Sequence, residues 1–219
     1  MKKVISLLLV FSVVFAFASC SKDGSSYDSD FYEDYPTGDI VETIEIKKNP
    51  VATITLEDGS EIVMELYYYS APNTVASFIA FAEEGVYDGM AFNMVRNKCI
   101  VMTGAAEGEF SAPYYIMDEY IEGEENQVSH TYGAVSMART SHSDTVTGQF
   151  FVLTKDQKHF DGNYNAFGYI TEGMDIVEKI AASELDADNK LFNPYVIKSV
   201  KVDTFGKKFP KPNIIKKDS

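Results

Sequence analysis

The chain has 219 residues, of which 45% are hydrophobic, and it carries a formal net charge of −14 at pH 7. This acidity, together with the lack of a lysine or arginine cluster between residues 49 and 205, argues against nucleic acid as a partner and against electrostatic adhesion to anionic lipid. The chain has two cysteines, so its fold must depend on a hydrophobic core, and a central region of about 160 residues is long enough to form one.

The N-terminal segment has the pattern of a secretory signal peptide. Two lysines precede an apolar run over residues 4–17, and small residues then lead to Cys20. The run is too short for a comfortable membrane span. Residues 1–19 resemble a bacterial lipoprotein signal, which implies that Cys20 carries lipid and holds the protein in the cell envelope, at the outer membrane. The alternative is an ordinary cleaved signal peptide, with Cys20 left as a free thiol.

Two polar segments flank the central domain, which is expected to span residues 49–205. Residues 20–48 are rich in Asp, Glu, Ser, Gly and Tyr, a composition typical of a disordered, self-repelling tether of about 30 Å. An alternative is that the Ser-Lys-Asp sequence after Cys20 acts as a sorting signal. The basic tail, residues 206–219, contains two prolines and is expected to lie outside the domain and to be frayed.

The domain begins with an expected hairpin and an expected helix. Val51 to Leu56 and Glu61 to Leu66 are short runs rich in β-branched residues, and the Asp-Gly pair between them is typical of a hairpin turn. Between residues 75 and 82, apolar residues recur at i, i+3, i+4 and i+7, which predicts one buried face of a helix. Gly85 is placed to end that helix.

Short strands and a second helix account for the rest of the domain. Alternating or apolar runs predict strands over Ala91 to Val95, Ile100 to Thr103, Gly133 to Ala138, Gln149 to Thr154, Ala166 to Ile170 and Val196 to Val202. Inward-facing apolar residues predict a helix over Gly173 to Ala182. Many short strands with two helices favour a closed antiparallel barrel.

A set of ordered motifs resembles one family. The sequence Ser136 to Thr140 followed by Gly148 to Phe151 is similar to the core motif of bacterial cyclophilins, which are peptidyl-prolyl cis-trans isomerases. Other matching motifs, in chain order, are Ala71 to Val75, Glu84 to Gly89, Phe160 to Gly162, Phe167-Gly168 and Glu172 to Asp175. The resemblance covers about Val51 to Thr204. It implies a mainly β fold, a closed eight-stranded antiparallel barrel capped by two α-helices.

The resemblance also implies a set of site residues. Isomerisation must lower a barrier of about 18–20 kcal/mol that comes from amide resonance. An apolar pocket that holds the proline ring and a donor aimed at the imide nitrogen serve this end. The implied pocket residues are Cys99, Ile100, Phe151 and Phe160. The residues implied to orient the substrate backbone are Gln149 and Tyr164, the main chain around Ala138 and Arg139, and His159 at the rim.

Two positions depart from the family pattern at the reacting centre. Met94 stands where the family has its catalytic arginine, and Met102 stands where it has a glutamine. A thioether cannot donate a hydrogen bond, and loss of one preorganised donor in comparable sites lowers the rate by about 10²–10³. The two methionines could instead form an apolar floor. Arg96 follows Met94 by two residues and shares its face in an extended strand, so it either compensates or is an ordinary solvated arginine.

Other chemistries are not indicated. The three histidines are dispersed, so no metal site is expected, and no cofactor motif is present. The expected function is isomerisation of Xaa-Pro bonds in exported proteins by a monomer, with reduced activity. One alternative is a catalytically silent chaperone or adaptor that binds proline-containing peptides. A further alternative is a structural subunit of an envelope complex.

Overall fold

A computed structural model describes residues 35–37, 44–106, 113–120, 128–140 and 146–216. The expected signal peptide, Cys20 and most of the expected tether lie outside these residues. The expectations about lipid attachment and about the tether therefore stay predictions.

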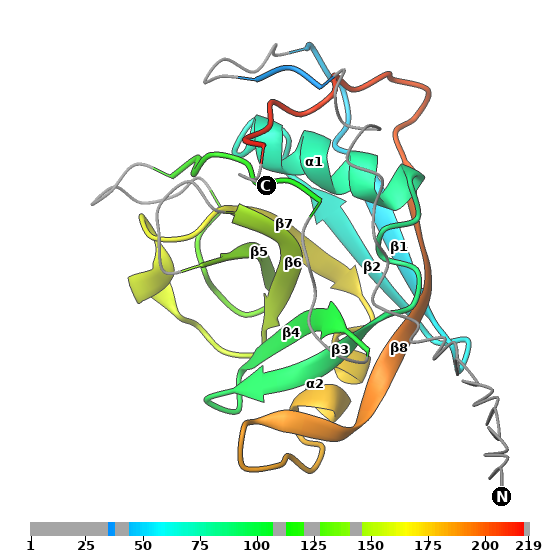
Figure 1. Cartoon of the computed structure of the whole chain (residues 1–219), viewed down its shortest axis with the longest axis vertical. Helices are drawn as coiled ribbons and strands as arrows, with labels where there is room; N and C mark the ends of the chain where they lie inside the picture. The colour runs from blue at the N-terminus through cyan, green and yellow to red at the C-terminus, as the bar shows by residue number, and fades with distance from the viewer. Residues whose placement is uncertain (1–34, 38–43, 107–112, 121–127, 141–145, 217–219) are drawn as a thin grey trace, which may run out of the picture.

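The described residues form a closed antiparallel barrel (Figure 1). Its strands are β1 (Val51–Leu56), β2 (Glu61–Leu66), β3 (Met90–Arg96), β4 (Ile100–Ala105), β5 (Ala134–Arg139), β6 (Val146–Leu153), β7 (Ala166–Glu172) and β8 (Lys190–Asp203). Around the barrel they follow the order β1-β2-β7-β5-β6-β4-β3-β8. Helix α1 (Pro72–Glu83) lies across one end and α2 (Met174–Ala181) lies toward the other. A short 3-10 turn, η2 (Lys158–Phe160), precedes β7. The predicted fold class is confirmed.

The first predicted elements are confirmed at their predicted places. The β1–β2 turn contains Gly59 at φ 84°, a conformation that glycine adopts without strain. Helix α1 has Pro72 in its first turn, where a missing N–H costs nothing. It ends before Gly85, which has φ 70° and donates its N–H to the carbonyl of Ala82.

Strand β8 is longer than predicted, because it begins at Lys190 rather than at Val196. Pro194 within it cannot donate to a strand ladder. The register between β3 and β8 is irregular at this place: Phe92 lies opposite Tyr195, but Met94 lies opposite Lys190. The extra β8 residues bulge out of the ladder there, and the bulge accommodates the proline.

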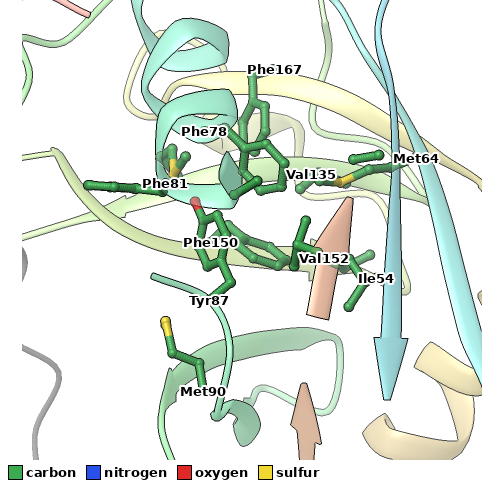
Figure 2. Close-up of a cluster of buried hydrophobic side chains, with 14 of the residues drawn as sticks. Ile54, Met64, Phe78, Phe81, Tyr87, Met90, Val135, Phe150, Val152 and Phe167 are labelled. Carbon is green, nitrogen blue, oxygen red and sulfur yellow. The ribbon is translucent and has the colours of Figure 1, made fainter. Parts of the chain in front are cut away.

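The main core lies inside the barrel under α1. Figure 2 shows Phe78 of α1 close to Phe150 and Phe167, with Tyr87 nearby. The Phe78 ring centroid is 4.9 Å from that of Tyr87, 5.5 Å from that of Phe167 and 5.8 Å from that of Phe150. Such tilted and edge-on aromatic pairs add to the burial of apolar area. The core therefore fixes α1 and the inner face of β6 together.

A carboxylate from a distant loop caps α1. The residue before the helix, Ala71, has no side chain that can cap it. Instead, Glu119 accepts hydrogen bonds from the backbone N–H groups of Asn73 and Thr74, at 2.7 and 2.6 Å, and from the Thr74 hydroxyl. These N–H groups would otherwise lack an intrahelical partner. A carboxylate at this end also suits the helix dipole.

Replacing Glu119 with alanine should lower the free energy of unfolding by about 2 kcal/mol, since it leaves buried helix donors without an acceptor. Urea unfolding of the two proteins measures the difference. The matched control is Glu83→Ala, at the exposed C-terminal end of the same helix. An equal effect of both substitutions would show that Glu119 does not act as the cap.

The C-terminal tail packs on the domain, contrary to the expectation that it is frayed. The Asn73 side chain donates to the Asn213 carbonyl at 2.9 Å and accepts the Asn213 N–H at 2.8 Å. Ile214 is buried and donates its N–H to the carbonyl of Pro36. The tail is held because its apolar residue covers α1 and its backbone groups find partners. The segment around Pro36, which precedes the domain, lies against the same end of the barrel.

Candidate functional site

The candidate site lies on the outer face of the barrel, across four neighbouring strands. Directly opposed residues in antiparallel strands project to the same face. The pairings Lys190 with Met94, Met94 with Met102, and Met102 with Phe151 therefore place one continuous row on β8, β3, β4 and β6. Phe150, the neighbour of Phe151, points into the main core instead, as alternation along a strand requires.

A second apolar cluster surrounds Phe151 on this face. Its buried members are Cys99, Ile100, Ala134, Ala138, Phe151 and Leu153, and Met102, Phe160, Tyr164 and Tyr169 pack against them. The Phe151 ring is 6.0 Å from Phe160 and 5.8 Å from Tyr164, both edge-on. The structure thus brings together the residues that the sequence assigned to a proline pocket. The small side chain of Cys99 forms part of the wall.

Side-chain amides lie beside this cluster. Gln149 donates from Nε2 to the Thr103 carbonyl at 2.8 Å, and Asn93 donates from Nδ2 to the Ala105 carbonyl at 2.7 Å. Gly104 lies between the two amides and leaves room for both. A Cβ at this position would lie only 2.8 Å from Asn93 Nδ2 and 3.0 Å from Gln149 Nε2. Asn93 was not among the predicted site residues. Its one signal in the sequence is that it immediately precedes Met94.

The side chain of Arg96, two residues after Met94, contacts the Met94 side chain. Nε of Arg96 is 3.2 Å from Sδ of Met94, within reach of a weak N–H to sulfur hydrogen bond. Arg96 is exposed. Arg96 is thus close enough to Met94 for compensation and also exposed like an ordinary solvated arginine, so both alternatives stay predictions.

The remaining predicted residues lie around Phe160 and Tyr164, at the edge of the second apolar cluster. Arg139 lies over the Tyr164 ring at 5.2 Å and donates from Nε to the Asn163 carbonyl at 3.1 Å, so it does not approach Met94. His159 is exposed, with its ring 4.4 Å from that of Phe160. The carbonyl of Ala138 accepts the Thr147 hydroxyl at 3.2 Å. These groups form a polar rim around the aromatic residues.

A buried histidine supports the aromatic cluster from behind, a feature that sequence reasoning missed. His130 is fully buried, with Nδ1 2.7 Å from Oδ1 of Asp161 and Nε2 3.0 Å from the Ser136 hydroxyl. Its ring is stacked at 6.4 Å from Phe151 and edge-on at 5.8 Å from Phe160. A neutral imidazole satisfies both bonds, by donating from Nδ1 to Asp161 and accepting the Ser136 hydroxyl at Nε2.

Burial and hydrogen bonding shift the pKa values of both His130 and Asp161. Burial lowers the pKa of His130 below its ordinary 6.5 and outweighs the opposite effect of Asp161. For Asp161, burial raises the pKa, but hydrogen bonds from Ser129 and from the backbone and ring of His130 together lower it below 3.8. The pair therefore favours a neutral histidine and an ionised aspartate.

Stability should fall as the pH falls. Below about pH 6.5 the unfolded chain binds a proton at His130 that the folded chain does not, and below about pH 4 the same holds at Asp161. Both depressed pKa values therefore reduce the free energy of unfolding toward acid. Urea unfolding between pH 7 and pH 5 tests the histidine. His159→Gln, at an exposed position, should keep the pH dependence, and a flat profile in the unmodified protein would contradict the assignment.

The described part of the chain contains neither a metal-binding cluster nor a membrane-spanning helix. No group of three His, Cys, Asp or Glu side chains is placed to hold a metal ion. No helix there is long and apolar enough to span a membrane.

A closed antiparallel barrel of eight strands with an aromatic cluster on its outer face is the arrangement expected of a cyclophilin-type domain. The sequence profile described as "Cyclophilin type peptidyl-prolyl cis-trans isomerase/CLD" matches residues 51–202. The chain therefore belongs to this family.

Sequence relatives include enzymes of known name. "Peptidyl-prolyl cis-trans isomerase B" of Bacillus subtilis (strain 168) is 36% identical over 131 residues, which cover 59% of this chain and 90% of that protein. "Peptidyl-prolyl cis-trans isomerase" of Helicobacter pylori (strain ATCC 700392 / 26695) is 34% identical over 155 residues, which cover 67% of this chain and 93% of that protein. The similarity thus spans almost the full length of these relatives.

Solved structures show the same fold at lower sequence identity. A crystal structure of a cyclophilin type peptidyl-prolyl cis-trans isomerase of Cryptosporidium parvum has a TM-score of 0.60 at 19% identity, and the match covers 71% of this chain and 98% of that one. A second structure of that protein, determined in the presence of the dipeptide ala-pro, has a TM-score of 0.59 at 20% identity. Its match covers 70% of this chain and 99% of that one.

Proposed function

We propose that the chain is a peptidyl-prolyl cis-trans isomerase that acts on Xaa-Pro bonds of exported proteins, with lower activity than relatives that carry an arginine in place of Met94. The observation that carries the proposal is the second apolar cluster on the outer face. The rings of Phe151, Phe160 and Tyr164 pack together, with Ile100 and Met102 in the same cluster. An apolar, aromatic cluster of this kind suits a proline ring, and the family membership supports the reaction.

In this proposal different residues of the site hold the proline ring and hydrogen-bond the substrate, and no covalent bond forms. The aromatic cluster holds the proline ring while the chain on one side of the imide bond rotates. Tyr164 and Gln149 offer a hydroxyl and an amide to the substrate carbonyls. Twisting the bond localises the lone pair on the imide nitrogen, so a donor near Met94 stabilises the transition state more than the ground state. Arg96 is the nearby donor in the described structure.

A silent binding module is the second candidate. Met94 and Met102 lie side by side on β3 and β4, and neither can donate a hydrogen bond. Polarizable thioethers adapt to varied apolar partners. The protein would then grip proline-containing segments as a chaperone or adaptor and leave the isomerisation rate almost unchanged.

The proposed cellular setting follows from the N-terminal sequence. A lipid on Cys20 would anchor the chain in the cell envelope, at the outer membrane, and residues 21–48 would join it to a monomeric domain. Labelling of Cys20 with a radioactive fatty acid, compared with Cys20→Ser, tests the anchor.

The activity is tested on a panel of Xaa-Pro peptides with the unmodified protein, Phe151→Ala and Gln149→Ala. Phe151→Ala should lower kcat/KM at least tenfold, because it removes the central ring of the pocket. Gln149→Ala should lower it as well. Circular dichroism checks that both variants are folded, and Lys155→Ala, at an exposed position, serves as the control. Peptide binding without turnover would favour the silent module, whereas absence of both binding and turnover would overturn the proposal.

A further inference from the structure

Two cations flank Met94 at the edge of the groove. Lys190 of β8 is the direct cross-strand partner of Met94, so its side chain leaves the sheet on the same face. Arg96 lies two residues further along β3, also on this face, with Nε beside the Met94 sulfur. Both residues are exposed. The position that lacks the family's arginine is therefore bordered by positive charge from two strands.

Neither cation is neutralised within the described part of the chain. Neither Arg96 nor Lys190 forms an ion pair with a described residue, and the histidine–carboxylate contact found there, between His130 and Asp161, is a hydrogen bond of a neutral histidine behind Phe151. Asp188, the acidic residue closest to Lys190 along the chain, forms no ion pair with it. Asp186, two residues earlier, accepts the backbone N–H groups of Lys190 and Asp188 at 2.8 and 2.9 Å. Its carboxylate holds the turn before β8. The charges of Lys190 and Arg96 thus face solvent at the groove, in a chain whose net charge is −14.

We propose that Arg96 and Lys190 form a recognition site for an acidic side chain on the substrate, so that this protein prefers Xaa-Pro segments with Asp or Glu near the proline. The proposal rests on the proposed function of the groove and names its substrate class. It assigns to this pair a role in selection, beyond the question of whether Arg96 assists the chemical step.

The spacing of the strands sets the distance from proline to the acidic residue. The row from Phe151 to Lys190 crosses three strand intervals of about 4.8 Å, or about 14 Å in total. An extended peptide advances about 3.3 Å per residue, and the lysine side chain can reach back toward the groove. The acidic residue is therefore expected two to four residues from the proline, on one side only, because the cations lie on one side of the aromatic cluster.

The expected preference is moderate. An exposed ion pair contributes about 0.2–1 kcal/mol, so two cations acting on one carboxylate should tighten binding about three- to tenfold at low salt. The preference should decrease at high salt, because ions screen exposed charges.

The test uses capped nine-residue peptides with a central proline, in which Glu, Gln or Lys is placed in turn at each of the other positions. Binding to the unmodified protein is measured by NMR titration at about 20 and 300 mM salt, and the cis-trans exchange rate is measured on the same samples. Glu peptides should bind more tightly than their Gln counterparts over a short window on one side of proline. Lys peptides should bind least tightly.

The single variant Lys190→Gln, which keeps Arg96, should reduce the preference for Glu over Gln peptides, and the double variant Arg96→Gln/Lys190→Gln should abolish it. The matched control is Lys179→Gln on α2, whose side chain lies 5.8 Å from the Tyr195 ring, away from the groove residues. Equal binding of Glu and Gln peptides, or a preference that survives the double variant, would overturn this inference and leave the proposed function standing. Failure of every peptide to bind would overturn both.

Discussion

Replacing Met94 with arginine is expected to raise kcat/KM for Xaa-Pro isomerisation about ten- to a hundredfold. Met94 and its cross-strand partner Met102 stand at the proposed reacting centre, where a thioether offers no donor to the imide nitrogen. A preorganised donor in a comparable position accounts for about 10²–10³ in rate. Part of that effect should be recovered, because the aromatic cluster that positions proline is already in place.

The measurement is a proline-isomerisation assay on neutral peptides, with Met94→Leu as the size-matched control. Met94→Leu should leave the rate near that of the unmodified protein, since it removes the sulfur without adding a donor. A gain with arginine alone would show that the groove is intact and limited by its missing donor. No gain, with the unmodified protein already fast, would mean that another group supplies the donor, and Arg96→Ala would then be expected to abolish turnover.

Replacing Asp161 with alanine is expected to lower the free energy of unfolding by about 3 kcal/mol, because it leaves several partly buried donors without their acceptor. The carboxylate accepts hydrogen bonds from the Ser129 hydroxyl, the His130 backbone and the His130 ring. All three donors would lose their acceptor at once. Because His130 stacks on Phe151, the loss should also loosen the proline pocket.

Urea unfolding gives the change in stability, and peptide titration gives the change at the groove. The control is Asp88→Ala, at an exposed position after α1, which should change stability by less than about 0.5 kcal/mol. Weakened peptide binding by Asp161→Ala, under conditions in which the variant is fully folded, would show that the pair supports the groove. Equal losses of stability in the two variants would refute its structural role.

Much of the barrel could be predicted because each strand carries its own signal. The alternation in β1 and β2, the Asp-Gly turn and the apolar period of α1 are local patterns. Phe150 and Phe151 went to opposite faces because side chains alternate along a strand. The ordered family motifs added the closure into an eight-stranded barrel, whereas the order of the strands around it was not predicted, because local patterns do not contain it.

The features that could not be predicted depend on partners that are distant in sequence. His130 and Asp161, whose side chains are hydrogen-bonded, are 31 residues apart in the sequence. Glu119 and Thr74, at the start of α1, are 45 residues apart. The three histidines looked dispersed because only the folded loops bring His130 behind Phe151. The C-terminal tail looked frayed because nothing in its composition reveals that Asn73, 140 residues earlier, will hold Asn213.

Strand β8 closes the barrel by pairing with both β1 and β3. A chain made or threaded N-terminus first therefore presents two unpaired strand edges until residues 190–203 have emerged, and edges of this kind invite pairing with other chains. The hydrogen bond between the Asn73 side chain and the Asn213 carbonyl also needs residue 213, which comes after β8 in the sequence. The barrel therefore cannot close before residues 190–203 are available to pair with β1 and β3.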